Sequence, residues 1–363
     1  MPFFRYKNIK ISAAAAAVPT ERIPVDSYCW INGAETVEKF KAMTGIQEFR
    51  RTLPHQTASD LGFVAANRIL EAQNIDRDTI GALVFVAHST DYRRPATACV
   101  LHKRLGLSKN CAAFDISLGC SALVYGLQTV CSMMSNSDIE RALLIVGETM
   151  TKMVGPKDRS VNMMFGDGGA ALLLEKENTC TDEINILLKT DGNGYNAIIA
   201  PAGGFRNMYA SQEEMEWPDG NIRTLYNTYM NGTEVFSFTV TDVPKTVKEF
   251  LAITNTSVDD YDSFIFHQAN RFILKQLCKK LKIPAERMPI SLSKFGNTSA
   301  AATALTLCDA YGNVSGQSIR TMFCCFGIGL SWGVVSANIR TESVYPILET
   351  DEIFEEGIIN NPF

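Results

Sequence analysis

Cys120 is the residue whose position in this sequence most favours covalent chemistry. It lies in residues 114–127 (FDISLGCSALVYGL), where an apolar run typical of a β-strand ends and a run typical of a helix begins. Free backbone N–H groups and the positive end of a helix dipole at such a junction stabilise a thiolate. We therefore expect Cys120 to have a lowered thiol pKa and to act as a nucleophile. The alternative is packing, because the chain has ten cysteines and a buried cysteine usually behaves as a small hydrophobic side chain.

His267 and Asn297 are the polar residues that we expect beside Cys120. His267 ends an apolar run in FHQAN, and Asn297 lies in KFGNTSAA. A core histidine held by one hydrogen bond and an asparagine that caps a helix are the structural alternatives. The spacings match, because His88 precedes Cys120 by 32 positions and His267 precedes Asn297 by 30. In a duplicated fold, equivalent strand ends would face each other and would bring Cys120 and Asn297 into one pocket.

A glycine-rich segment near the C-terminus is a further candidate. Residues 323–333 (FCCFGIGLSWG) contain glycines that let backbone N–H groups approach a ligand. A tight turn between two strands is the structural alternative. A nucleotide-binding glycine loop is disfavoured, since a strand and not a helix is expected to follow.

The elements that must position these residues alternate between helices and buried strands. Helical spacing covers residues 36–43, 57–73, 96–105 and 120–134, and apolar runs typical of buried strands cover 80–87, 111–116, 142–147 and 170–175. The same order recurs at 262–270, 289–298, 321–325 and 332–339, with helices up to 281 and from 299. This alternation predicts an α/β protein made of two duplicated halves, residues 1–178 and 184–341.

Three segments lie outside this repeat. The alanine run at 13–17 is interpreted as a first strand followed by a turn of small residues, and not as part of a signal peptide. Residues 201–229 are rich in polar, aromatic and turn residues and predict a surface cap or substrate-entry loop. The acidic extension 342–363 is expected to be a disordered tail, or else to dock through Ile347, Leu348, Ile353 and Phe354.

Composition argues against several classes of function. The chain has 363 residues, 46% hydrophobic and 20% charged, which is typical of a globular protein with a large core. A net charge of −5 gives no basic field for nucleic acid, and no apolar run is long enough to span a membrane. The cysteines lack CxxC pairs and framework spacing, so we expect a cytoplasmic location and no metal site.

Five short motifs together resemble one family. They are CSA at Cys120, FGDGGAA at Phe165, HQAN at His267, GNTSAA at Asn297 and FGIGLSWG at Phe326, in order within residues 10–339. The set is similar to that of β-ketoacyl-acyl-carrier-protein synthase III, in the thiolase superfamily. The resemblance implies an α/β, thiolase-like five-layer αβαβα fold, a homodimer, and an active site of Cys120, His267 and Asn297.

The resemblance also implies a mechanism. Cys120 would attack an acyl thioester while the backbone of Cys120, Ile328 and Gly329 stabilises the oxyanion. Malonyl-acyl carrier protein would then lose carbon dioxide while His267 and Asn297 hold its thioester carbonyl, and the carbanion would attack the acyl-enzyme. The implied substrates are acyl-coenzyme A or acyl carrier protein with malonyl-acyl carrier protein, and no cofactor is implied.

Departures from the family's motifs bear on the substrate. Lys39 and Met43 stand where the family has a tryptophan and an arginine that hold coenzyme A, although Arg159 matches a second arginine at that entrance. Arg94 replaces an aromatic residue that reaches the partner subunit's acyl pocket. This favours a short, polar or acidic acyl group, unless Arg94 turns to solvent as arginines usually do. Ile328 replaces a glycine and is expected to narrow the pocket.

Substrate contact and carrier docking involve further residues. Phe165, which opens FGDGGAA, is an expected substrate contact. Because an acyl carrier protein is acidic, its docking needs a basic face near the entrance. One expected helix after HQAN carries four basic residues, the first three at four-residue steps: Arg271, Lys275, Lys279 and Lys280. A solvated helix face is the alternative for this stripe.

Three other functions compete with the synthase. A papain-like protease has cysteine, histidine and asparagine in the same order, but it would need a tryptophan soon after the cysteine and a disulfide pattern. A non-catalytic partner that binds acyl carrier protein is a stronger rival, although all three candidate residues are present. An acyltransferase that passes the acyl group to an alcohol or amine, in a secondary-metabolite or polysaccharide pathway, is the third.

Overall fold

Two mixed β-sheets form the centre of the protein in this computed structural model, which describes residues 1–179 and 182–359. The first sheet has the order β17-β2-β8-β7-β5-β6. Its strands are β2 (Ile9–Pro19), β5 (Ile80–Val86), β6 (Ala112–Ile116), β7 (Arg141–Thr149), β8 (Asp167–Lys176) and β17 (Leu348–Thr350). The second sheet has the order β1-β9-β16-β15-β14. Its strands are β1 (Phe3–Lys7), β9 (Glu183–Thr190), β14 (Ser263–Phe266), β15 (Ser318–Gly327) and β16 (Ser331–Arg340).

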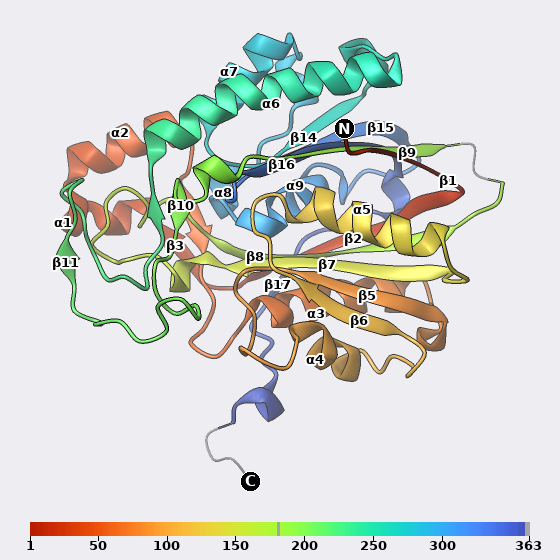
Figure 1. The fold of residues 1–363 in the computed structure, drawn as a ribbon, viewed down its shortest axis with the longest axis horizontal. Coiled ribbons are helices and arrows are strands. Elements are labelled where there is room, and N and C mark those ends of the chain that lie inside the picture. Colours follow the sequence, from red (N-terminus) through yellow and green to blue (C-terminus); the bar gives the residue numbers. More distant parts are fainter. Residues whose placement is uncertain (180–181, 360–363) are drawn as a thin grey trace.

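Helices pack on both faces of each sheet and complete five layers (Figure 1). Helices α6 (Gly232–Thr254) and α7 (Arg271–Leu281) cover the outer face of the second sheet. Helices α5 (Ala122–Ser135) and α9 (Ala302–Tyr311) lie between the sheets, and α3 (Ala58–Ala72) and α4 (Thr97–Arg104) cover the outer face of the first. The predicted five-layer αβαβα arrangement is confirmed.

Short elements surround one end of the layers. They are α1 (Cys29–Asn32), α2 (Ala34–Thr44), α8 (Leu292–Phe295), and the strand pairs β3–β4 (Arg22–Pro24, Glu48–Arg50), β10–β13 (Ile198–Ile199, Tyr229–Met230) and β11–β12 (Met215–Glu216, Ile222–Arg223). Within the described residues, none of the helices combines the length and the apolar character needed to cross a membrane.

The buried core follows the layers. One apolar cluster joins α5 and α9 to the facing sides of both sheets, a second lies beneath α6 and α7, and a third lies beneath α3 and α4. Strand β14 is buried along its whole length, as expected for a strand that is covered by helices on both faces. Strand β6 differs from the expectation, because it is an edge strand whose residues are half-buried or exposed.

The alanine run is not a turn, which corrects the expectation for residues 13–17. It continues strand β2 to Pro19, and Ala15, Ala16 and Ala17 are completely buried. Helices α3 and α9 both contact this strand, one on each face. Small side chains let both helices approach the sheet closely, so the run reflects tight packing on two sides.

Residues 289–298 are also not a strand. Their only regular element is the single helical turn α8, and Asn297 forms an isolated bridge with Phe165. The Ser291 N–H donates to the Gln268 side chain (3.1 Å) and not to a neighbouring strand. Gly296 then adopts a left-handed φ of +63°. These two features divert the chain from the sheet edge.

Strand pairing does not follow the boundaries expected for the two halves, 1–178 and 184–341, and for the extension, 342–363. Strand β1 pairs with β9 in the sheet of the second half, and β17 pairs with β2 in the sheet of the first half. Dividing the chain at these boundaries therefore does not assign every strand to the sheet of its own segment.

The C-terminal extension is docked over residues 342–359, so the disordered alternative is wrong for this part. Residues 360–363 lie outside the described part of the chain. Glu349 contacts the buried Arg50 (2.9 Å), and Glu352 contacts the buried Arg104 (3.2 Å). The buried Gln56 amide donates to two carbonyl groups of the extension. The cation of Arg104 also lies over the Phe354 ring. Polar anchors, more than the four expected apolar residues, hold this segment.

Candidate active site

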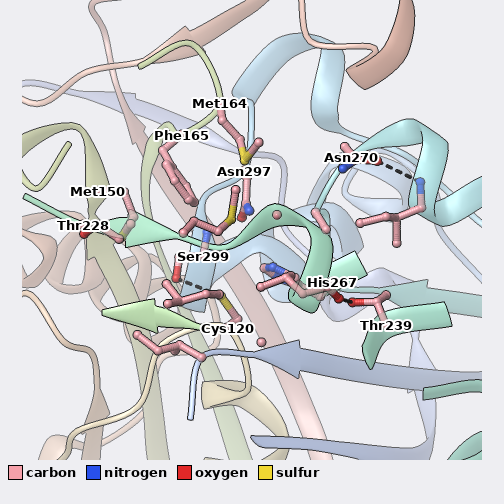
Figure 2. Close-up of a pocket in the computed structure, with 18 of the residues that line it drawn as sticks. Cys120, Met150, Met164, Phe165, Thr228, Thr239, His267, Asn270, Asn297 and Ser299 are labelled. Atoms are coloured by element: carbon pink, nitrogen blue, oxygen red, sulfur yellow. Dashed lines mark hydrogen bonds between the residues drawn. The ribbon is translucent and has the colours of Figure 1, made fainter. Parts of the chain in front are cut away.

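One cavity of about 830 Å³ collects the candidate catalytic residues. Cys120, His267 and Asn297 all line it, from three separate segments of the chain (Figure 2). Cys120 follows edge strand β6 and His267 follows edge strand β14, so both project beyond the carboxyl ends of strands. The structure thus brings Cys120 and Asn297, which the matching spacings paired, into one cavity with His267.

The Cys120 thiol lies in a low-dielectric environment. Helix α5 begins at Ala122, two residues later than expected, so Cys120 precedes its first turn. Burial raises the pKa of the Cys120 thiol, while hydrogen bonds from Ser299 and from the Ile328 backbone act in the opposite direction. The net shift is opposite to the lowering that the strand–helix junction predicted, because desolvation outweighs the local donors.

The glycine turn after β15 approaches the thiol closely. A Cβ atom on Gly327 would lie 2.5 Å from the Cys120 Cβ and 2.8 Å from its Sγ. Only glycine leaves room for the cysteine at this point. Gly329 adopts a φ of +136°, which L-residues rarely adopt. The side chain of Ile328 lines the cavity and turns toward Gly119, as a narrowing residue would.

His267 is held as a neutral imidazole. Its backbone N–H donates to the Cys324 carbonyl (2.8 Å), and its ring packs edge-to-face on Phe326 with centroids 5.5 Å apart. Burial lowers the pKa of His267 from 6.5 to about 4. Its Nδ1 has no hydrogen-bond partner among the described residues. Near neutral pH the ring therefore has one N–H to donate and no charge.

Asn297 is oriented by its own loop. Its N–H donates to the Met164 carbonyl (2.9 Å), and its carbonyl accepts from Gly166 N–H (3.1 Å). Its side-chain oxygen accepts from Ser299 N–H (2.9 Å), which leaves the amide nitrogen as the free donor. A Cβ atom on Gly166 would lie 2.2 Å from the Phe295 carbonyl oxygen, so the glycine of FGDGGAA lets this loop pack.

Two groups emerge among the expected substrate contacts (Phe165, Arg159 and Arg94) and the two departures from the family's motifs (Lys39 and Met43). Phe165 and Met43 line the cavity, and Met43 is 56% exposed at its mouth. Arg159, Arg94 and Lys39 are exposed and do not line it. The backbone N–H of Arg159 donates to the Asn221 side chain (3.1 Å), and Lys39 pairs with Glu35 (2.6 Å).

The cap at 201–229 holds the loop that carries Arg159. Arg223 is completely buried and donates to Asp158 (2.5 Å) and to Asp219 (2.7 Å). Its guanidinium also lies over the rings of Trp217 and Tyr229. The neighbouring Lys157 pairs with Glu214 (2.5 Å). The cap is therefore held to the loop at 157–159 by ion pairs, and the buried Arg223 makes the central one.

The basic stripe lies on α7, whose first turn reaches the cavity through Phe272 and Ile273. Lys275, Lys279 and Lys280 are exposed, whereas Arg271 is half-buried and donates to the Ala42 carbonyl (2.8 Å). Lys280 donates to the Val240 carbonyl (2.6 Å). Lys275 and Lys279 are thus the members of the stripe with no hydrogen bond or ion pair within the described chain.

Sequence reasoning did not single out several residues of the cavity. Ser299 contacts the thiol, and the motif GNTSAA already contained it. His88, used only for spacing, lines the cavity near Gly119. Nothing in the periodicity signals that five methionines converge on the wall, namely Met43, Met150, Met153, Met164 and Met230. Their flexible thioether side chains make the wall adaptable.

Solved structures define the class of protein. A 3-oxoacyl-(acyl-carrier protein) synthase from Burkholderia xenovorans has a TM-score of 0.91 at 33% identity, covering 96% of this chain and 99% of its own. A 3-oxoacyl-(acyl carrier protein) synthase III from Pseudomonas aeruginosa has a TM-score of 0.79 at 25% identity, covering 95% and 100%. The fold is therefore that of the thiolase-like condensing enzymes.

Sequence relatives identify the family within that class. Models of 3-oxoacyl-[acyl-carrier-protein (ACP)] synthase III match residues 114–192 and, for the C-terminal part, residues 251–339. The beta-ketoacyl-[acyl-carrier-protein] synthase III of Caldanaerobacter subterraneus is 36% identical over 80% of this chain and 85% of its own. That of Limosilactobacillus reuteri is 30% identical over 92% and 99%. This chain belongs to the 3-oxoacyl-[acyl-carrier-protein] synthase III family and is an acyltransferase, which confirms the resemblance.

Proposed function

We propose that the protein catalyses decarboxylative condensation of a Cys120-bound acyl group with malonyl-acyl carrier protein, giving a 3-oxoacyl carrier protein. The main supporting observation is that one thiol and two uncharged hydrogen-bond donors, His267 and Asn297, converge on one cavity. A non-catalytic carrier-binding protein would not need this convergence. The reaction fits the names of the relatives, which are 3-oxoacyl and beta-ketoacyl carrier-protein synthases.

The first half-reaction transfers the acyl group to sulfur. The Cys120 thiolate attacks the thioester carbonyl, and the tetrahedral oxyanion accepts hydrogen bonds from the backbone N–H groups of Cys120 and of the turn at Ile328 and Gly329. The C–S bond to the donor then breaks, and the departing thiolate takes up the proton that Cys120 released. The low dielectric of the site strengthens these hydrogen bonds.

The second half-reaction forms the carbon–carbon bond. Malonyl-acyl carrier protein loses carbon dioxide, and the electron pair of the broken bond moves onto the thioester as an enolate. His267, with its proton on Nε2, and the Asn297 amide donate to the enolate oxygen. The enolate carbon attacks the acyl-Cys120 carbonyl, and the Cys120 thiolate leaves. The Cys120 thiolate then takes a proton from solvent and returns to the resting thiol. All bonds and protons of the cycle are thereby accounted for without a metal or redox cofactor.

The donor and the assembly are part of the proposal. Lys39, in place of an aromatic clamp, pairs with Glu35 and does not line the cavity, which favours a carrier-bound donor over coenzyme A. Arg159 and Arg94, both exposed, would act at the entrance and at the partner subunit. A homodimer is supported by β6, an edge strand left half-exposed, since unpaired strand edges invite pairing with another chain.

Intact-mass measurement tests the reaction. The protein is incubated with a panel of acyl-coenzyme A and acyl carrier protein thioesters, and then with malonyl-acyl carrier protein. We expect an acyl adduct that is absent in Cys120→Ala and that disappears when the malonyl carrier is added. Asn297→Ala should keep the adduct but slow its loss by roughly 100-fold to 1000-fold, the cost of removing one donor to a developing oxyanion.

Three outcomes would contradict the proposal. If no thioester labels Cys120, the carrier-binding alternative is favoured. If the adduct is stable to malonyl carrier and is released only to an alcohol or amine, the chain is the acyltransferase with an alcohol or amine acceptor and not a condensing enzyme. If Asn297→Ala slows acylation of Cys120 as much as it slows loss of the adduct, the assignment of this residue to the second half-reaction is wrong.

Docking of the carrier is tested by charge reversal on α7. Lys275→Glu with Lys279→Glu should raise the KM for malonyl-acyl carrier protein and weaken its dependence on salt, because an acidic partner would lose attractive charge. Lys109→Glu, an exposed change between α4 and β6, is the matched control. Equal KM values in the double variant and the control would contradict docking on this stripe.

A further inference from the structure

Ser299 has a backbone conformation that its sequence does not explain. Its φ is +48°, in the left-handed region where glycine is the usual residue. A serine at this position is less stable than a glycine by roughly 1 kcal/mol. Neighbouring residues hold it there, since its N–H donates to the Asn297 side chain (2.9 Å). Backbone strain that is kept next to a nucleophile indicates that the Ser299 side chain has a function.

The Ser299 side chain has one contact of note. Its hydroxyl lies 3.6 Å from the Cys120 Sγ, within hydrogen-bond distance for sulfur, as Figure 2 shows with a dashed line. Over the described residues this is the only hydrogen bond of the hydroxyl. Ser299 is only 3% exposed and lines the cavity, so little water competes for the contact. The left-handed backbone is what directs the hydroxyl at the sulfur.

We propose that Ser299 is a fourth catalytic residue, whose hydroxyl donates a hydrogen bond to the Cys120 sulfur and stabilises the thiolate. This rests on the proposed function only in taking Cys120 as the nucleophile. The thiolate exists twice in the cycle, when it attacks the donor and when it leaves during condensation. In both steps the negative charge is on sulfur, whereas His267 and Asn297 are assigned to a carbonyl oxygen. Ser299 therefore serves an atom that His267 and Asn297 do not.

Ser299 also connects two candidate catalytic residues, Asn297 and Cys120, through its backbone and its side chain. Asn297 accepts from the Ser299 N–H, and Ser299 in turn contacts Cys120. One side-chain oxygen of Asn297 thus fixes the residue that supports the nucleophile, while its nitrogen is left for the enolate. The thiol would lose support if either link were removed, but only the Ser299 link acts on the sulfur directly.

Ser299→Gly separates the chemical role from a structural one. Glycine adopts the left-handed backbone without strain, so this variant should fold at least as stably as the wild type. Ser299→Ala lacks the hydroxyl and keeps the strain. The readout is the pH dependence of Cys120 alkylation by iodoacetamide, followed by peptide mass spectrometry. Cys99, which is exposed, serves as the reference thiol in the same sample.

We expect both variants to alkylate Cys120 about tenfold more slowly near neutral pH, with the kinetic pKa of this thiol raised by about one unit. This is the effect of losing one hydrogen bond to a charged group. Cys99 should react as in the wild type. Acylation by the best thioester donor should slow by a similar factor in both variants.

Two results would overturn the inference. One is an unchanged alkylation profile for Cys120 in folded Ser299→Gly. The other is a slowing in Ser299→Ala alone, because Ser299→Gly lacks the same hydroxyl and its normal rate would show that the hydrogen bond to sulfur is dispensable. Failure of the proposed function is seen separately, as absence of any acyl adduct in the wild type, and it leaves the alkylation comparison intact.

Discussion

Replacing Gly327 by alanine tests how tightly the glycine turn holds the nucleophile. Gly327 ends strand β15 and lies directly against Cys120. Its φ is not in the left-handed region, so alanine introduces no backbone strain. The added methyl group would instead lie 2.5 Å from the Cys120 Cβ and 2.8 Å from the Sγ. Unstrained contacts between such atoms need about 3.5–4.0 Å. The two residues must separate by about 1 Å.

This displacement sets the expected magnitude. A misplacement of about 1 Å in a reacting group costs roughly 100-fold in rate, which is about 2.7 kcal/mol in the activation free energy. Overpacking of a filled site lowers the free energy of unfolding by about 1–3 kcal/mol. We expect Gly327→Ala to lose about 100-fold in the rate of Cys120 acylation while most of the protein remains folded at 25 °C.

The assay is the rate of acyl-adduct formation by intact mass, together with urea denaturation of each variant. Gly232→Ala is the matched control, because Gly232 also lines the cavity but a Cβ atom there would have no neighbour within 4 Å. The control should acylate within about twofold of the wild type. A folded Gly327→Ala variant that acylates at the wild-type rate would refute the claim that this contact positions the sulfur.

Three further predictions concern buried charge. Burial lowers the pKa of His267 from 6.5 to about 4, so the unfolded chain binds an extra proton between these values. The free energy of unfolding should therefore fall as the pH drops from 6.5 to 4, and urea titrations should show a smaller fall in His267→Gln. Arg223→Leu leaves the buried Asp158 carboxylate unpaired and should cost about 3–5 kcal/mol, with a loss below 1 kcal/mol counting against it. Ending the chain at residue 341 removes residues 342–363 and leaves the buried Arg50 without its partner Glu349. The Tm should therefore drop by roughly 5–10 °C. An unchanged Tm would show that the extension adds no stability.

The sequence was sufficient for the arrangement of the large elements and for the family. Long apolar runs such as residues 80–87 identify strands buried on both faces, and their recurrence predicts the duplicated layers. The same logic failed for residues 13–17. Periodicity records burial, and a run of alanine is equally compatible with a tight turn and with a strand between two helices. Strand exchange at β1 and β17 was also missed, because pairing partners are chosen by tertiary contacts that local pattern does not encode.

At the active site, the sequence predicted which residues come together better than it predicted their pKa values. The repeat placed Asn297 and His267 with Cys120 and motif similarity supported all three, but the thiol pKa moves in the direction opposite to the one predicted. The prediction of a lowered thiol pKa considered only the backbone dipoles where strand and helix meet. The dominant effect is instead desolvation of Cys120, and the residues that bury it come from the whole chain. The buried Arg223 was hidden for a similar reason. An arginine in a polar segment looks solvent-exposed until the carboxylates that surround it are known.

The pKa values of Cys120 and His267 shift in opposite directions for the same reason, which is burial. Burial raises the pKa of the thiol and lowers the pKa of the imidazole, so the resting pair is neutral and does not exist as a thiolate–imidazolium ion pair. Glu148, also buried and held by three hydrogen bonds from His88 and Ser89, would further oppose charge on the sulfur if ionised. Charge then appears only during the reaction, on sulfur or on a carbonyl oxygen. Because a low dielectric strengthens each hydrogen bond to such transient charge, donors fixed beforehand stabilise the transition state more than the resting site.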